Sequence, residues 1–200
     1  MPLPPPAPRD ELHLRRIELR GYRRHDGLYD IEARMVDTKT RELTLGDGRI
    51  VPLGDPVHDM SIRLVVDEDL NVIDIVASTD ASPFDICGEA TSTLQSMKGL
   101  RIAAGWSAAI RQRLAGRNGC THLTELLAPL ATVAFQTLSD VRQAKPTPVD
   151  ANGKPRKIDS CYAYASDREV VQRRWPMYYD GPAPARPASE GGATSTKSST

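Results

Sequence analysis

Cysteine and histidine side chains stand at a few positions where regular structure is expected to begin or end. Cys120 precedes a long stretch with an apolar stripe, and His122 follows two residues later. Unpaired N–H groups and the positive end of the helix dipole favour a thiolate at a helix start, where it can act as nucleophile or metal ligand. Cys120 and His122 are therefore the first candidates for a site. The alternative is that Cys120 is a small core residue and His122 only hydrogen-bonds a carbonyl group.

Further candidates flank a predicted hairpin. His58 and Asp59 precede its first strand, and Cys87 ends the loop after its second strand. Two antiparallel strands joined by a tight turn return to the same edge, so these residues are expected to lie close together. Thiolate and imidazole are the ligand types of zinc and iron–sulfur sites. The first hypothesis is a scaffold-like or accessory protein that binds zinc or an iron–sulfur cluster through His58, Cys87 and Cys120, with Asp59 or His122 completing the site.

The same residues also fit an enzyme. Cys120 would be the nucleophile and His122 the base, because a neighbouring imidazole activates a thiolate within hydrogen-bond reach. Cys87 is the alternative nucleophile or acid and His58 the alternative base, and Asp59 or Asp80 would orient the base. A hydrolase or isomerase acting on a small acyl or lactone substrate fits this pair, although the sequence has no nucleophile-elbow or phosphate-loop motif. A third hypothesis is a non-catalytic interaction or ligand-binding protein with Cys87 and Cys120 in its core. The residue types alone leave all three open.

The elements that must position these residues predict an α+β domain. Alternating apolar and charged residues indicate two antiparallel hairpins, and apolar residues spaced by three and four indicate helices. Pro129 is expected to kink the last helix or to shorten its first part. The fold predicted is an antiparallel sheet of four to five strands covered on one face by about three helices. The strands are expected over 14–22, 28–36, 62–66 and 72–77, and the helices over 89–97, 106–114 and 123–141.

Composition shifts along the chain predict four parts. They are a disordered proline-rich arm (1–11), the α+β domain (12–143), a linker and aromatic C-terminal strap (144–180) and a disordered tail (181–200).

Charge and cysteine content limit the partners and the cellular compartment that we expect. The 26 basic residues balance 26 acidic ones, which gives no reason to expect nucleic-acid binding. No apolar run is long enough to cross a membrane, and the proline-rich start is unlike a secretory signal. Three cysteines without a disulfide pattern fit a reducing cytoplasm. The expected partner is a metal ion or a small molecule, with a protein partner as an alternative. Cys161, in the strap, is interpreted as incidental.

The order of parts from His58 to Leu138 resembles iron–sulfur scaffold proteins of the NifU or IscU type. In those proteins a ligand cysteine precedes a strand, where His58-Asp59 stands here. A hairpin then leads to a second cysteine, as at Cys87, and a third begins a long helix in a Cys-x-x-Leu context, as in Cys120-Thr-His-Leu123. The resemblance implies a NifU/IscU-like core over about eighty residues. The Gly-Cys-Thr-His-Leu phrase also resembles an uncharacterised bacterial family of unknown function.

Overall fold

The computed structural model describes residues 3–182, which form two compact units, residues 3–144 and residues 145–182. Residues 3–12 at the start of the first unit form no helix or strand. Most of the tail predicted to be disordered lies outside the described residues. Each unit is described by itself below.

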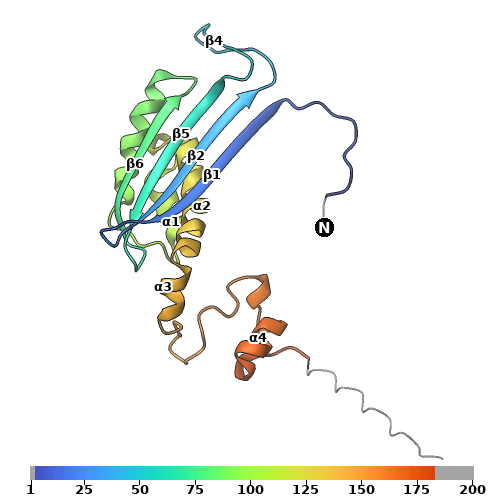
Figure 1. Cartoon of the computed structure of the whole chain (residues 1–200), viewed down its shortest axis with the longest axis vertical. Coiled ribbons are helices and arrows are strands. Elements are labelled where there is room, and N and C mark those ends of the chain that lie inside the picture. The colour runs from blue at the N-terminus through green and yellow to red at the C-terminus, as the bar shows by residue number, and fades with distance from the viewer. Residues whose placement is uncertain (1–2, 183–200) are drawn as a thin grey trace, which may run out of the picture. The chain divides into compact units, whose positions relative to one another are not determined.

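The first unit is built on a four-stranded antiparallel sheet with the order β1-β2-β5-β6 (Figure 1). Consecutive strands pair, because each turn brings an alternating segment back beside the one before it. A two-stranded ribbon interrupts the sequence between β2 and β5 without joining the sheet. The strands are β1 (His13–Arg23), β2 (Tyr29–Lys39), β3 (Leu43–Thr44), β4 (Ile50–Val51), β5 (Pro56–Val66) and β6 (Val72–Ala81).

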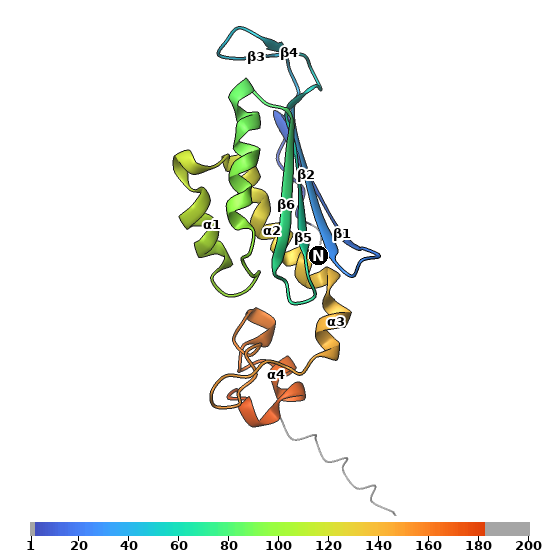
Figure 2. The ribbon, with the colours of Figure 1, turned by 90° about the vertical axis from the view of Figure 1, so that its left-hand side faces the viewer.

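Helices cover one face of this sheet (Figure 2). The central helix, α2, packs across β1, β2 and β5, whereas η1, a 3₁₀ helix, lies along β6. A further helix, α1, packs against both of them. The helices of this unit are η1 (Asp85–Met97), α1 (Trp106–Leu114), η2 (Gly116–Asn118), α2 (Thr121–Thr137) and α3 (Ser139–Ala144). The predicted α+β fold, with an antiparallel sheet covered on one face, is confirmed.

The core lies between the sheet and the helices. Because side chains alternate along a strand, Ile31 and Met35 of β2 point to the helices and are fully buried, while their neighbours are not. From the other side α2 contributes an apolar stripe at the three- and four-residue spacing of a helix. Its buried residues are Leu123, Leu126, Leu127, Leu130, Ala131 and Ala134. The register of the strands and the phase of α2 are thus fixed by the same buried surface.

Several predicted boundaries differ from the structure. β5 begins at Pro56, so His58 and Asp59 lie inside a strand and not before it. Cys87 lies inside η1, which begins at Asp85 and therefore absorbs part of the predicted loop. Cys120 is the N-cap residue of α2, as predicted, and the helix continues through Pro129 to Thr137.

The second unit is small and is held together by hydrogen bonds, an ion pair and a few buried side chains. The hydroxyl of Tyr178 donates to the carbonyl of Gly153 at 2.9 Å, and Lys154 pairs with Asp159 at 2.8 Å. Val171 is its fully buried apolar residue. Its helices are η3 (Tyr162–Tyr164), α4 (Glu169–Arg174) and η4 (Pro176–Tyr178). In the described part of the chain, no helix has both the length and the apolar character needed to span a membrane.

Candidate functional site

Three neighbouring strands each carry a polar residue at one end of the face that the helices cover. Arg15 of β1 stands opposite Asp37 of β2, and Asp37 stands opposite His58 of β5. In β2 the buried residues alternate up to Asp37, so the apolar stripe ends in a carboxylate. β1 and β5 begin at this end of the sheet and β2 finishes there. A row of polar side chains therefore closes one end of the core.

Asp37 is the most buried member of this row, with a side chain only 2% exposed. Its Oδ1 accepts from Nε of Arg15 at 2.7 Å, and its Oδ2 accepts from Nη2 of the same guanidinium at 2.7 Å. Burial alone would raise the pKa of Asp37. The hydrogen bonds and charge of Arg15, with His58 and His13 nearby, outweigh it and hold that pKa below its usual range. The carboxylate is therefore ionised at neutral pH.

His58 lies against this carboxylate, with Nδ1 3.0 Å from Oδ2 of Asp37. Burial lowers the pKa of His58, and the neighbouring His122 lowers it further, whereas Asp37 acts in the opposite direction. The ring is consequently neutral at pH 7. An ionised carboxylate only accepts hydrogen bonds, so this contact assigns the ring proton of His58 to Nδ1. Its Nε2 then carries an available lone pair.

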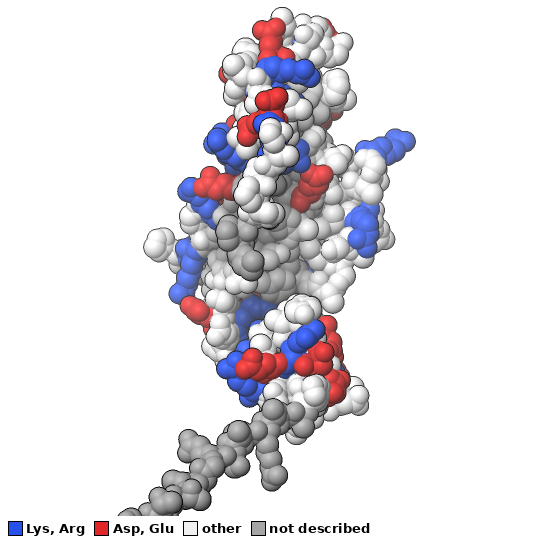
Figure 3. All heavy atoms as spheres, turned by 90° about the vertical axis from the view of Figure 1, so that its right-hand side faces the viewer, with Lys and Arg blue, Asp and Glu red and all other residues white. Residues whose placement is uncertain are grey.

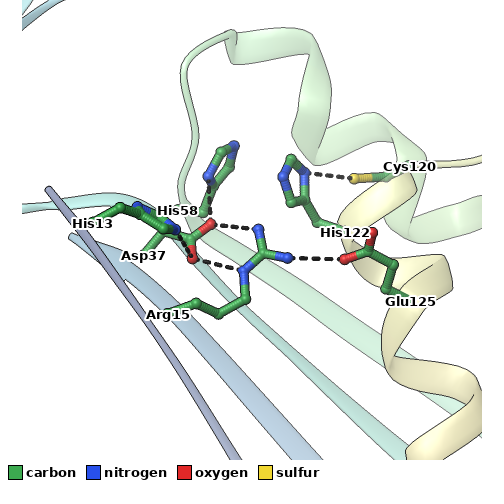
Figure 4. A network of polar contacts seen from close by, with 7 residues as sticks. All are labelled: His13, Arg15, Asp37, His58, Cys120, His122 and Glu125. Carbon is green, nitrogen blue, oxygen red and sulfur yellow. Dashed lines mark hydrogen bonds and ion pairs between the residues drawn. The ribbon is translucent and has the colours of Figure 1, made fainter. Parts of the chain in front are cut away.

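The first turn of α2 supplies the other side of the site (Figure 4). The ring of His122 lies over that of His58 with the centroids 3.9 Å apart, and its Nδ1 is 4.0 Å from Sγ of Cys120. Glu125, three residues after His122 and hence on the same face of the helix, accepts from Nη1 of Arg15 at 2.9 Å. Helix and sheet are thus joined through Arg15 on one side and through the two imidazoles on the other.

Asp37, His58 and His122 form a group of potential metal ligands. One donor atom from each lies within 4.8 Å of the donors of the other two. Two ligands of a tetrahedral zinc ion, each bonded at about 2.1 Å, are about 3.4 Å apart, so side-chain movements of roughly an ångström bring the three donors into range. Terminal torsions of histidine and aspartate are soft enough for such movements. Two imidazoles and a carboxylate are donors that zinc and other divalent transition metals accept.

The structure brings some of the predicted site residues together and places the others elsewhere. His58 and His122 belong to the group, and Cys120 contacts it through His122. Asp59 follows His58 in the strand and points to the opposite face, where Arg34 binds its two oxygens at 2.9 and 2.6 Å. Cys87 belongs to no such ligand group among residues 3–182, and Cys161 is exposed in the second unit.

Sequence reasoning missed Asp37, Arg15 and Glu125. A signal for Asp37 was present, because it continues the two-residue alternation of Ile31, Ala33 and Met35 and so had to face the core. Arg15 and Glu125 had no comparable signal. Their roles depend on strand pairing and on where α2 crosses the sheet.

The uncovered face of the sheet carries the larger of the two hollows that we describe, about 550 Å³ in volume. Its charged lining comes from neighbouring strands: Glu18, Arg20, Glu32, Arg34 and Arg63. Basic and acidic side chains are likewise interspersed on the face seen in Figure 3. Neither this hollow nor the smaller one beside the start of α2 includes His58, His122 or Cys120 in its lining. The site is therefore a compact cluster at the end of the sheet.

Comparison with protein families gives one assignment. A family model described as a protein of unknown function, DUF2889, matches residues 13–136, from the first residue of β1 almost to the end of α2. The chain belongs to the DUF2889 family. Comparisons with curated proteins and with solved structures gave no match. The matched segment contains every residue of the cluster in Figure 4.

Proposed function

We propose that this chain is a metal-binding protein that holds a divalent transition-metal ion at the group of side chains formed by Asp37, His58 and His122. The observation that carries the proposal is the convergence of three donors from β2, β5 and α2 to within 4.8 Å. These residues are far apart in the sequence and meet only in the fold. A neutral His58 supports the proposal, because metal binding requires an unprotonated ring nitrogen.

The donor set favours zinc over an iron–sulfur cluster. Iron–sulfur clusters need several thiolates, and here one cysteine, Cys120, stands beside the group while Cys87 lies outside it. Imidazole nitrogens beside a carboxylate instead suit a single ion with further positions open to water or a substrate. The iron–sulfur scaffold activity and the likeness to NifU or IscU therefore remain predictions from the sequence, as does the cytoplasmic location.

The test is a metal titration of the full chain without an affinity tag. After removal of bound metal with EDTA, zinc is titrated in competition with a chromophoric chelator. We expect one zinc per chain in the parent protein and no measurable binding in His58→Ala and His122→Ala. His25→Ala is the matched control, since His25 is exposed in the β1–β2 turn. Circular dichroism establishes that each variant is folded. A parent chain that binds no zinc, or His25→Ala losing as much as the site variants, would overturn the proposal.

A second candidate function rests on the contact between Cys120 and His122, 4.0 Å from sulfur to Nδ1. Such a pair is the core of a thiol-dependent hydrolase or isomerase, with Cys120 as nucleophile and His122 as base. Alkylation by iodoacetamide, followed by peptide mass spectrometry, tests this alternative. Under this alternative, iodoacetamide should alkylate Cys120 faster at pH 7 than the exposed Cys161. The alkylation of Cys120 should be slower in His122→Ala. Equal or slower reaction of Cys120 would exclude the alternative.

A further inference from the structure

We infer that Asp37 and Cys120 serve the proposed metal site as hydrogen-bond partners of its two histidines and leave both Nε2 atoms to bind the ion. This inference rests on the proposed function and assigns unequal roles within the group. His58 and His122 bind metal directly. Asp37, braced by Arg15, and Cys120 are positioning residues that set which ring nitrogen is available.

The contacts of Asp37 argue for this division. A carboxylate offers about four lone-pair positions; those of Asp37 make three hydrogen-bond contacts, and Nε2 of His13 lies close by. Oδ1 faces Nε of Arg15 at 2.7 Å and Nε2 of His13 at 3.4 Å, while Oδ2 faces Nη2 of Arg15 at 2.7 Å and Nδ1 of His58 at 3.0 Å. A metal–oxygen bond would compete with these partners for a buried anion. Ligation through His58 needs no such displacement.

The contact with Asp37 also decides the donor atom of His58. Because the carboxylate accepts the hydrogen on Nδ1, the lone pair of the neutral ring lies on Nε2. Metal-binding histidines commonly donate their other N–H to a carboxylate, which fixes the ring orientation and raises the basicity of the ligand atom. Asp37 stands in that position relative to His58.

His122 repeats the arrangement from the other side. Its Nδ1 faces Sγ of Cys120, and Figure 4 shows its second ring nitrogen on the side of His58. Sulfur is an acceptor for an N–H group, weak as a thiol and stronger as a thiolate. With the hydrogen on Nδ1, His122 also presents Nε2. Both rings are therefore expected to leave Nε2, whose lone pair lies in the plane of its ring, free for the ion.

Arg15 extends this support to the helix. Its guanidinium binds Asp37 with two nitrogens and Glu125 with the third. Glu125 and the ligand His122 belong to the same helical face, so one guanidinium ties the partner of His58 to the turn that carries His122. The planar fork makes these parallel bonds, which a lysine cannot reproduce.

The experiment combines ring-proton assignment with metal affinity. Long-range ¹H–¹⁵N spectra of the metal-free chain are expected to show His58 and His122 protonated on Nδ1, and zinc is expected to shift both Nε2 signals. Asp37→Asn is expected to move part of His58 to the Nε2-protonated form and to weaken zinc binding about 10- to 100-fold, as loss of an outer partner does. Arg15→Lys should weaken binding in the same direction with the ligand set unchanged, and it serves if Asp37→Asn does not fold.

Cobalt distinguishes the two roles of Cys120. If Cys120 is an outer partner, the cobalt-loaded chain shows no thiolate-to-cobalt charge-transfer band, and Cys120→Ser keeps its zinc affinity within a few-fold. A charge-transfer band that disappears in Cys120→Ser would make Cys120 a direct ligand and overturn the inference. His58 protonated on Nε2 in the parent chain would overturn it too. A chain with the expected ring protons but no zinc binding would instead refute the proposed function alone.

Discussion

Replacing Arg15 with methionine tests the partly buried ion pair between Arg15 and Asp37. The change keeps an unbranched side chain of similar length but removes the guanidinium that makes two 2.7 Å hydrogen bonds to Asp37. The carboxylate, 2% exposed, would keep only His58 and His13 as neighbours in the row. Leaving one partner of a fully buried ion pair alone costs about 3–5 kcal/mol. Since the Arg15 side chain is 31% exposed, solvent screens part of the interaction. We therefore expect a loss of about 2–3 kcal/mol in the free energy of unfolding at pH 7.

The assay is equilibrium urea unfolding in EDTA, followed by circular dichroism. Arg20→Met is the matched control, because Arg20 lies on the same strand but pairs with Glu18 on the exposed face, and it should leave stability unchanged within error. Asp37→Asn should lower the free energy of unfolding less in the Arg15→Met chain than in the parent chain, because the guanidinium that pairs with the carboxylate is already absent there.

The same contact predicts a pH dependence. Asp37 has a lowered folded-state pKa, so its stabilisation is complete above the unfolded value of about 3.9 and is lost as the pH falls through the lower folded pKa. The difference in the free energy of unfolding between the parent chain and Arg15→Met should therefore become smaller below about pH 4. A loss no larger than that of Arg20→Met, or strict additivity in the double variant, would refute the reasoning.

Three further predictions follow from other residues. In EDTA the free energy of unfolding should fall as the pH drops below the ordinary histidine pKa of about 6.5. The reason is that the pKa of His58 is lowered in the folded chain, so the unfolded chain binds the proton first. In His58→Gln the free energy of unfolding, measured in urea, should depend less on pH in this range. Asp59→Asn should leave the zinc dissociation constant unchanged, since Asp59 binds Arg34 on the opposite face, and a weaker constant in the chelator assay would show that Asp59 reaches the site. Gly21→Ala should destabilise the chain by about 1–3 kcal/mol in urea, because the new methyl group would overlap the side chain of Thr137. Thr137→Ala in the same chain should restore part of the loss, because it removes the hydroxyl and methyl groups but keeps Cβ.

Much of the fold followed from local patterns. The alternation in residues 14–22 and 28–36 predicted β1 and β2, and the apolar stripe after Cys120 predicted α2 with its start at that residue. Both patterns are set by neighbours in the sequence, and burial of one face then decides register and phase. The start of β5 was missed because the apolar run becomes continuous only at residues 62–66, whereas pairing with β2 extends the strand back to Pro56.

The site was only partly predictable for the same reason. Because side chains alternate along a strand, His58 lies with Met60 and Ile62 on the core face, and Asp59 lies on the other face. The sequence alone could have shown this. The ion pair of Asp37 with Arg15 depends on pairing between β1 and β2, and aspartate has a low strand propensity, so a buried one was not expected. Cys87 was placed near the site on the assumption of a loop, but that segment forms η1 along β6.

The most direct test of the metal site is an X-ray anomalous-scattering map at the zinc absorption edge, from crystals of the zinc-loaded chain. The account predicts one peak beside the rings of His58 and His122, close to the plane of each ring and within about 2.0–2.1 Å of the Nε2 atom of each. That peak should be absent from crystals of His58→Ala grown with the same zinc. A peak at Cys87, Cys161 or Asp59, or a zinc-loaded chain with no peak at the two histidines, would contradict the account.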